Sequence, residues 1–175
     1  MAPPRRWGFY QLRPDWAERL VADAGVRAGD LVLDVGAGLG GLTVPLVAAG
    51  ARVIAVEAHP RRARWLRERF GRTVTVVQAD ARELRLPRRP FSVVANPPFA
   101  VSAPLLRRLL QPGNALVRAD LVLQQQVVRR WTSPAAPGHG RWARAFVASP
   151  GRRIPRAAFV PRPQVDARVL RLVRR

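Results

Sequence analysis

The feature that most constrains the fold is a regular alternation of short apolar segments with segments of helical periodicity. LVLDVG from Leu31 and ARVIAVEA from Ala51 are nearly continuous apolar runs, which predict strands buried on both faces of a sheet. Between them, residues 38–49 contain a glycine-rich turn followed by a helical pattern. Parallel strands need such a crossover helix, so the pattern predicts a doubly wound, mainly parallel α/β sheet.

The same alternation continues along the chain. PRRARWLRERF, from Pro60, has proline at a plausible first helical position and predicts an inner face made by Trp65, Leu66 and Phe70. Further helices are expected in DWAERLVADAG, APLLRRLL and QQQVVRRW, and further strands in TVTVVQAD, FSVV, RADLVL and DARVLRLVRR. WTSPAAPGHGRWAR, from Trp131, is rich in proline and glycine and is expected to be a mobile loop.

The length of 175 residues suits one domain with a sizeable core. We therefore expect a single domain over residues 1–175, with residues 1–14 as an arm that contributes to the ligand pocket. The chain has no cysteine, and His59 and His139 are its only histidines, so no metal site is predicted. No apolar run approaches bilayer length and no leader pattern opens the chain, which predicts a cytoplasmic protein without a membrane partner.

The charge of the chain points to a polyanionic partner. It has 31 basic residues, all of them arginine, against 11 acidic ones, for a formal net charge of +20. Codon bias explains arginine in place of lysine, but it does not explain the deficit of acids. Such an excess suits a phosphate backbone, because each neutralised phosphate releases counterions. Nucleic acid is thus favoured over an acidic membrane surface.

Three strand ends carry residues that suit a nucleotide-like ligand. Gly36, Gly38 and Gly40 follow the strand that begins at Leu31, where glycine lets the backbone approach a ligand and the next helix offers free N–H groups. Glu57 comes 21 residues after Gly36, at the place where a carboxylate can accept from ribose hydroxyls. These features alone fit a nicotinamide or an adenosyl cofactor. Asp80 ends the next strand and could accept from an adenine amine.

The ordered set resembles the motifs of S-adenosylmethionine-dependent methyltransferases, and Asp34 is then a supporting acid near the amino-acid end of the cofactor. Asn96-Pro97-Pro98-Phe99 follows a further strand and resembles the turn of enzymes that methylate an exocyclic or amide nitrogen. An amine conjugated to a ring is a poor nucleophile. The Asn96 side-chain oxygen and the Pro97 carbonyl could hold both amine hydrogens and aim the lone pair, while Phe99 stacks on the base.

AAFVPRPQVDARVL, from Ala157, is similar to the segment before the last strand of the rRNA adenine N6-dimethyltransferases. The resemblance covers residues 7–175 and implies a Rossmann-like, class I fold with S-adenosylmethionine as cofactor. It implies that Asn96, Pro97 and Phe99 are catalytic and that Phe159 stacks on the other side of the base. The cofactor residues implied are Gly36, Gly38, Gly40, Glu57, Asp80, Ala81, Asn96, Phe9 and Gln11.

Two branches share these motifs, the housekeeping small-subunit enzymes and the erythromycin-resistance (Erm) enzymes. The Asn96-Pro97-Pro98-Phe99 turn resembles the Erm enzymes better than the housekeeping motif, which typically has leucine directly after the asparagine. The segment ARVIAVEAHPRRARWLRERF and the arginine content also favour the Erm branch, which implies methylation of 23S rRNA and resistance to macrolides, lincosamides and streptogramin B. A monomer is expected. The chain departs from the family in having Gly8-Phe9-Tyr10 in place of Gln-Asn-Phe. The helical C-terminal domain of the family is also expected to be absent.

In that case RNA would be gripped by arginines of the one domain. Arg107 and Arg108 are predicted substrate-binding residues, and the other candidates are Arg61, Arg62, Arg64, Arg129, Arg130, Arg152 and Arg153.

Three alternatives stay open. The chain could be a small-subunit rRNA dimethyltransferase of the housekeeping branch. It could be an N6-adenine DNA or protein glutamine methyltransferase, which shares the Asn-Pro-Pro turn, although the segment from Phe159 to Asp166 speaks against this. It could also be a non-catalytic RNA-binding module, which would bind RNA in a salt-dependent way without affinity for the cofactor.

Overall fold

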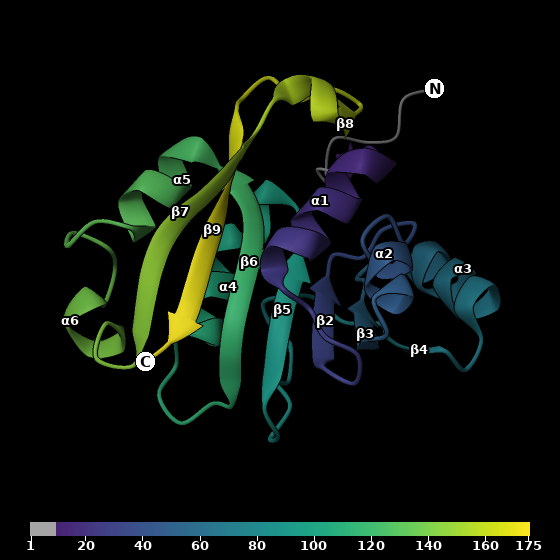
Figure 1. Ribbon diagram of the computed structural model, residues 1–175, viewed down its shortest axis with the longest axis horizontal. Coiled ribbons are helices and arrows are strands. Elements are labelled where there is room, and N and C mark those ends of the chain that lie inside the picture. The colour runs from purple at the N-terminus through teal and green to yellow at the C-terminus, as the bar shows by residue number, and fades with distance from the viewer. Residues whose placement is uncertain (1–9) are drawn as a thin grey trace.

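The computed structural model describes residues 10–175, which form a central twisted sheet with helices on both faces (Figure 1). The sheet has seven strands in the order β4-β3-β2-β5-β6-β9-β7. The first five run parallel, β9 is antiparallel to β6, and β7 is antiparallel to β9. The strands are β2 (Leu31–Val35), β3 (Arg52–Val56), β4 (Val74–Val77), β5 (Phe91–Ala95), β6 (Leu116–Gln124), β7 (Phe146–Ile154) and β9 (Ala167–Arg174). The predicted mainly parallel α/β sheet is confirmed.

The helices make two layers, one on each face of the sheet. The first layer covers β2 and β3 and contains α1 (Pro14–Ala24), α2 (Thr43–Ala48) and α3 (Pro60–Phe70). The second covers β5 and β6 and contains α4 (Ser102–Leu109), α5 (Gln125–Trp131) and α6 (His139–Trp142). Along β2, Leu31, Leu33 and Val35 pack toward the second layer and Val32 toward the first, so both faces of the strand are apolar, as its sequence predicts.

The order of the strands reverses between β2 and β5. The chain passes from β2 outward through β3 to β4, and then returns to place β5 on the other side of β2. In open parallel sheets, ligands bind outside the carboxyl ends of the strands at this type of switch point. The residues that follow β2 and β5 are Gly36 and Asn96, so the fold brings the glycine turn and the Asn-Pro-Pro-Phe turn to the same place.

A small second sheet ties the start of the described chain to the segment near its end. Strand β1 (Gln11–Leu12) pairs antiparallel with β8 (Phe159–Val160), with Leu12 opposite Phe159. The link is extended by Arg13, whose N–H donates to the Ala158 carbonyl at 2.8 Å. Between β7 and β8 the chain makes one 3-10 turn, η3 (Arg156–Ala158). This sheet lies above the carboxyl edge of the main sheet (Figure 1), and Tyr10 directly precedes its strand β1.

Three segments differ from the sequence prediction. Trp65 is on the outer side of α3 beside Arg69, whose guanidinium carbon lies 5.0 Å from its ring centroid, whereas Leu66 is fully buried. The predicted loop from Trp131 contains helix α6 and buries Trp131 and Trp142 in the core. Strand β7 had no sequence prediction, because its Pro150-Gly151 pair resembles a turn; a register shift between Pro150 and Arg153 accommodates it.

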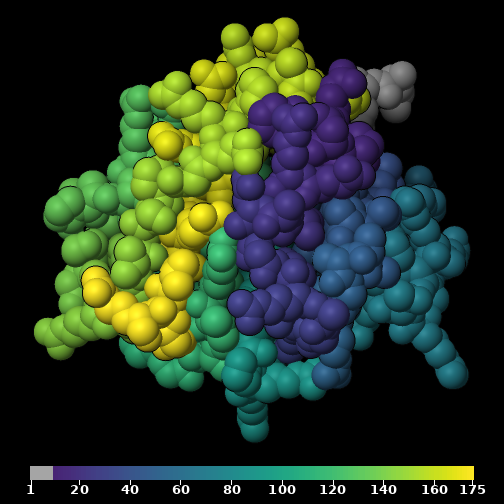
Figure 2. Space-filling model, viewed as in Figure 1, coloured from purple at the N-terminus to yellow at the C-terminus, as the bar shows by residue number. Residues whose placement is uncertain are grey.

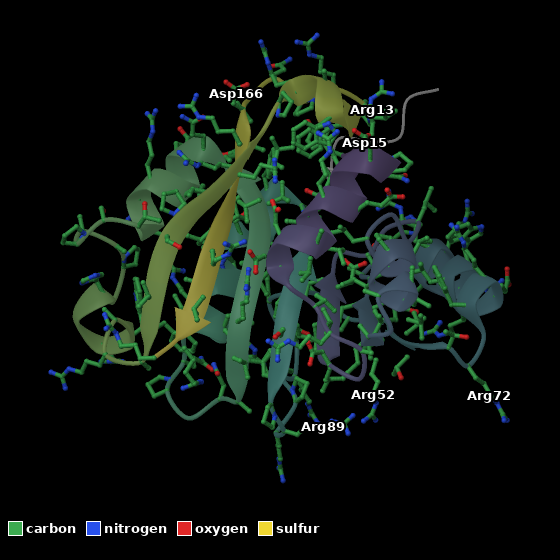
Figure 3. The ribbon with its side chains drawn as sticks, in the orientation of Figure 1. Arg13, Asp15, Arg52, Arg72, Arg89 and Asp166 are labelled. Carbon is green, nitrogen blue, oxygen red and sulfur yellow. The ribbon has the colours of Figure 1, made fainter. Side chains whose placement is uncertain are left out.

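The surface carries the excess of positive charge. Arginines project from it in many directions, among them Arg13, Arg52, Arg72 and Arg89 (Figure 3). On the face shown in Figure 2, atoms of β9 reach the surface beside α1. Beneath α1, the fully buried Asp120 accepts from the Nε atoms of Arg118 at 2.6 Å and Arg171 at 2.8 Å. These two arginines therefore serve the fold. In residues 10–175, no helix is long and apolar enough to cross a membrane.

Candidate active site at the carboxyl edge of the sheet

The glycine turn after β2 packs directly against the turn after β5. Gly36 has a φ of +78°, and a Cβ atom built on it would lie 2.9 Å from Cδ of Pro98 and 3.2 Å from Cα of Pro97. Its N–H donates to the Val56 carbonyl at 2.8 Å, which also ties the turn to β3. Only glycine combines this conformation with this approach. Gly36 thus sets the distance between the two predicted halves of the site.

Glu57 is the centre of the hydrogen bonding at the end of β3. Its side chain is 5% exposed, and its two carboxylate oxygens accept from the N–H groups of Gly38 and His59, each at 2.8 Å. Because a carboxylate has about four acceptor positions, each oxygen keeps one for a further donor. Glu57 is therefore held rigidly, with capacity left for a pair of hydroxyl groups.

Asp34 lies inside β2, next to this carboxylate, and is 1% exposed. It accepts from the Thr43 hydroxyl at 2.7 Å, which fixes it against the start of α2. Burial raises the pKa of Asp34 to about 7, with a smaller contribution from the charge of Glu57, while the Thr43 hydrogen bonds act in the opposite direction. A buried acid that is half protonated near neutrality favours a cation as its neighbour.

Two cavities meet at Glu57. The smaller, of about 30 Å³, is lined by Asp34, Gly36 and Asn96 among others and has room for little more than water. The larger, of about 270 Å³, is lined by Glu57, Asp80 and Ala81 together with Pro98 and Val101. Glycine, acid and asparagine positions that are up to 62 residues apart in sequence thus line two adjacent cavities, which share Gly36, Glu57, Arg62 and Pro98 and together form the cleft described below.

Asp80 and Ala81 both line the larger cavity, as predicted from their place after β4. The Asp80 side chain is 40% exposed, and its Oδ1 accepts from the Arg82 N–H at 2.8 Å. This bond closes a turn that presents the carboxylate to the cavity. Ala81 is buried and forms part of the wall.

Asn96 is anchored in a way that fixes the direction of its side-chain amide. Its Nδ2 donates to the Tyr10 carbonyl at 2.6 Å, and a carbonyl can only accept, so the amide nitrogen must face Tyr10. Within residues 10–175, the Asn96 Oδ1 accepts no hydrogen bond. The Pro97 carbonyl likewise accepts none there. Two neighbouring acceptor oxygens are therefore left available at the end of β5.

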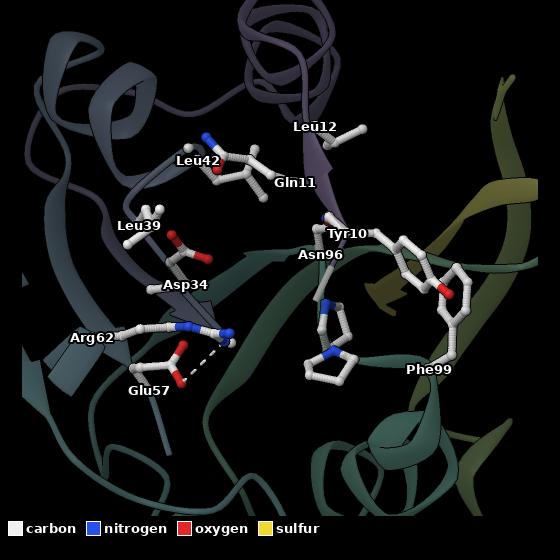
Figure 4. A pocket seen from close by; sticks show the side chains of 15 residues that line it. Tyr10, Gln11, Leu12, Asp34, Leu39, Leu42, Glu57, Arg62, Asn96 and Phe99 are labelled. Atoms are coloured by element: carbon white, nitrogen blue, oxygen red, sulfur yellow. Dashed lines mark hydrogen bonds and ion pairs between the residues drawn. The ribbon is translucent and has the colours of Figure 1, made fainter. Parts of the chain in front are cut away.

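Tyr10 also contacts the aromatic ring of the same turn. The ring centroids of Tyr10 and Phe99 are 5.7 Å apart, with the ring planes tilted by 33° (Figure 4). Both side chains are partly exposed, and the 3-10 turn η2 (Phe99–Val101) follows directly. Tyr10 thus supports Asn96 through its carbonyl and Phe99 through its ring, and nothing in the sequence pattern identified it.

In this structure Phe159 does not line the cleft, so its stacking on a base stays a prediction. Its side chain is 2% exposed, lies in the apolar core with Leu12 and Ala158, and does not line either cavity. The reason is the pairing of β8 with β1, which turns the ring inward over α1. In this structure Phe159 therefore holds the arm that carries Tyr10.

The other predicted residues of the pocket divide in the same way. Gly38 donates to Glu57, as described above, and Gln11 lines the smaller cavity beside Gly41. Gly40 does not face this cleft: with a φ of +85°, a Cβ on it would lie 2.9 Å from the Phe70 ring, so it packs the turn against α3. Phe9 lies outside the described residues.

The predicted pair on α4 is also divided. The Arg108 Nε donates to the Leu84 carbonyl at 2.6 Å and holds the segment that precedes β5. Arg107 is exposed and lines a different cavity, described below. Both belong to the last turn of α4, which leads away from the cleft over about 10 Å. Neither side chain faces the cleft.

Arg62 is a site residue that the sequence grouped only with the surface arginines. It reaches back from α3, lines both cavities, and places Nη1 4.0 Å from Glu57 Oε1 (Figure 4). Its side chain is 19% exposed. The helical position of Arg62 one turn after His59 could have signalled this proximity to Glu57.

Together, the reversed strand order, the glycine turn, the acids after β3 and β4 and the Asn-Pro-Pro-Phe turn define a class of protein, the Rossmann-like S-adenosylmethionine-dependent methyltransferases. Within that class, the sequence profile described as "Ribosomal RNA adenine dimethylase" matches residues 10–175. The chain belongs to this ribosomal RNA adenine dimethylase family.

Individual relatives agree with this assignment. The chain is 38% identical over 167 residues to ribosomal RNA small subunit methyltransferase A of Opitutus terrae, covering 87% of this chain and 60% of the relative. It is 37% identical to the protein of the same name from Leifsonia xyli subsp. xyli, covering 95% of this chain and 65% of the relative. The chain thus spans about 60–65% of the length of these curated relatives.

Among solved structures, the 23S rRNA methyltransferase ErmE superposes with a TM-score of 0.84 at 28% identity, covering 94% of this chain and 70% of that one. A dimethyladenosine transferase from Plasmodium falciparum superposes with a TM-score of 0.80 at 23% identity, covering 94% and 63%. The second likeness concerns the fold alone.

Proposed function

We propose that this chain transfers a methyl group from S-adenosylmethionine to the N6 atom of an adenine in ribosomal RNA. The observation that carries the proposal is the anchoring of Asn96. Because Nδ2 is held by the Tyr10 carbonyl at 2.6 Å, Oδ1 has one direction left, and together with the Pro97 carbonyl it forms a pair of acceptors. An amine with two hydrogens is the group that matches such a pair.

The acceptor chemistry requires this arrangement. The lone pair of an adenine N6 is delocalised into the ring, so the amine is planar and weakly nucleophilic. Two acceptors in fixed positions pull its hydrogens to one side and favour the tetrahedral geometry that develops in the transition state. Phe99, supported by Tyr10, offers its partly exposed ring for stacking on the base. A strong general base is not needed in this scheme.

The residues present fit the cofactor. Glu57 is buried, and each of its carboxylate oxygens accepts from one backbone N–H group and keeps one acceptor position. This arrangement suits two ribose hydroxyls. Asp80 borders the larger cavity, where it can accept from the adenine amine, and Asp34 lies where the positively charged amino-acid end would be placed. When bound, S-adenosylmethionine supplies a methyl group on a positively charged sulfur, which is an activated donor by itself.

An RNA substrate is supported by charge and by family. The net charge of +20 is unusual for an enzyme acting on a small molecule, and the relatives carry ribosomal RNA in their names. A base must leave its stack to reach a pocket at the end of β5, which is easier in a loop than in a regular duplex. In this proposal the arginines act on the backbone and the cleft acts on one base.

For the particular rRNA, the proposal follows the curated relatives to the small subunit, since those of Opitutus terrae, Chlorobaculum parvum and Leifsonia xyli are named as small-subunit methyltransferases. This reverses the preference for the Erm branch that the Asn-Pro-Pro-Phe turn and the arginine content suggested. A second candidate is an adenine of 23S rRNA, with resistance to macrolides as its consequence, because proline and not leucine follows Asn96 and because ErmE superposes well.

The two candidates are separated by primer extension on 16S and 23S rRNA from cells that express the chain or its Asn96→Ala variant. The proposal expects a strong stop at adenine positions in 16S rRNA that the variant does not produce. A stop confined to 23S rRNA would establish the second candidate instead. Stops in neither rRNA, with a folded protein that binds the cofactor, would refute ribosomal RNA as the substrate.

A further inference from the structure

A cavity larger than the two of the cleft lies away from it, and of its residues only Arg107 has a predicted role. We call it the α4–α6 groove. It has a volume of about 690 Å³ and lies between the last turn of α4 and the segment that contains α6. The residues of the groove used below are Arg107, Gln111, Trp131, His139, Arg141 and Trp142. A volume of this size matches the usual range of ligand sites.

The floor of the groove is aromatic and well ordered by contacts. The ring centroids of Trp131 and Trp142 are 6.2 Å apart, and the His139 ring meets Trp142 edge-on at 5.1 Å. The Trp142 indole N–H donates to the Pro137 carbonyl at 3.0 Å. This bond fixes the proline-rich segment against the floor, so the groove does not depend on a loose loop. His139 is partly exposed and offers a ring face at the rim.

The walls of the groove are basic. Arg107 stands on one side and Arg141 on the other, both exposed, and no acidic residue lines the groove. Within residues 10–175, neither guanidinium forms an ion pair or a hydrogen bond. This distinguishes Arg107 from Arg108, which is occupied by the Leu84 carbonyl. Two uncommitted cations on facing walls suit an anion placed between them.

We propose that the α4–α6 groove binds an unpaired nucleotide of an RNA strand, with its base against the partly exposed His139 ring, which the buried tryptophans support from below, and its phosphates between Arg107 and Arg141. This combination of a basic channel with aromatic side chains is the general means of binding single-stranded nucleic acid. Because the walls of the groove and the whole chain are positively charged, a polyanion is favoured as the occupant over a peptide without acidic residues. The inference deepens the proposed function and rests on it for the identity of the RNA.

The groove lies at a distance from the cleft, where it can orient the RNA strand. Helix α5 starts where β6 ends at the edge of the cleft, and leads to Trp131 after about 10 Å. The groove therefore holds RNA at least one helix length from the reacting adenine. Phosphate contacts fix register and orientation, so a second point of contact restricts which adenine can reach Asn96.

The test compares two double variants of the full chain that remove equal charge. Arg107→Ala with Arg141→Ala empties the groove walls, while Arg72→Ala with Arg89→Ala removes two exposed arginines elsewhere (Figure 3). The probe is a fluorescent 12-nucleotide RNA of mixed sequence, titrated without cofactor at several salt concentrations. The groove variant should bind about tenfold more weakly than the control, and its slope of log K against log salt should fall by about 1.4, since two phosphates lose their partners.

A second arm tests the aromatic contribution. The native chain should prefer the 12-nucleotide RNA over the same backbone without bases, and His139→Ala should lose at least half of that preference. Equal weakening of both double variants, or equal binding of RNA and the abasic backbone, would overturn the inference and leave a peptide as the occupant. These binding measurements do not depend on methyl transfer. If only the groove inference is wrong, the chain still methylates RNA but its RNA binding does not depend on the groove. If only the proposed function is wrong, RNA binding depends on the groove but no methylation is found.

Discussion

Replacing Asn96 by alanine separates catalysis from binding. Asn96→Ala removes the Oδ1 acceptor that we assign to the adenine amine and the Nδ2 bond to the Tyr10 carbonyl. The acceptor acts mainly in the transition state, when the amine becomes tetrahedral, so its loss should appear in kcat. Cofactor affinity should change far less, because Glu57 and Asp80 remain.

The size of the effect can be estimated from the geometry. One fixed hydrogen-bonding group aimed at a developing charge contributes about 10²–10³ in kcat, or about 2.7–4 kcal/mol. The bond from Asn96 to Tyr10 contributes roughly 0.5–1.5 kcal/mol to stability, so the variant should remain folded. Asn96→Asp should be equally inactive, because a carboxylate cannot donate to the Tyr10 carbonyl and would be turned away from it.

The assay is transfer of labelled methyl groups to rRNA under single-turnover conditions, with calorimetric titration of S-adenosylmethionine in parallel. Asn114→Ala is the matched control, since Asn114 also donates to a backbone carbonyl at 2.6 Å, that of Leu109, but precedes β6 at the opposite edge of the sheet. It should lose stability and keep its rate per folded molecule. Full activity of Asn96→Ala would refute the assigned role of this side chain.

The remaining predictions concern the cofactor side. Glu57→Gln should weaken cofactor binding by about 10–100-fold in calorimetry, because its amide must turn a donor toward the Gly38 or His59 N–H group; unchanged affinity would contradict the ribose assignment. Gly36→Ala should lower methyl transfer more than stability, as its Cβ would push Pro98 by several tenths of an ångström; a fully active variant would remove the link between the turns. Burial raises the pKa of Asp34 to about 7, above its unfolded value, so its contribution to stability is present below about pH 4 and is lost as the pH rises through 7. In urea unfolding, the free energy of unfolding of Asp34→Asn relative to the native chain should therefore rise by up to roughly 4 kcal/mol between about pH 4 and pH 8. A difference that stays constant over this pH range would contradict the prediction.

Much of the fold could be predicted because local signals and tertiary structure agree. Helix α3 has the predicted bounds, since Pro60 opens it and Gly71 closes it, and β2, β3 and β5 lie where the apolar runs are. Strand β7 could not be predicted, because Pro150 and Gly151 indicate a turn in the sequence, whereas in the structure pairing with β9 keeps this segment in the sheet. Trp65 was misplaced because Leu66 fills the inner position, and the stacked Arg69 makes an outer tryptophan acceptable.

The site shows the same division. Gly36, Glu57 and Asn96 were found because each directly follows a strand, and Asp80 because it comes three residues after β4. The sheet brings these strand ends together. Tyr10 was not, since its contacts depend on the two-residue pairing of β1 with β8, which leaves no periodic signal. Phe159 was assigned to the base by its motif, but the same pairing buries it. Long-range pairing of short segments is thus where sequence reasoning failed.

The most direct test of the central claim is mass spectrometry of nucleosides from rRNA incubated with the purified chain and S-adenosylmethionine carrying a deuterated methyl group. Our account predicts the mass label in N6-methylated adenosine, with its loss in Asn96→Ala. Label in another nucleoside, or its absence with a folded chain that binds both the cofactor and RNA, would contradict the account.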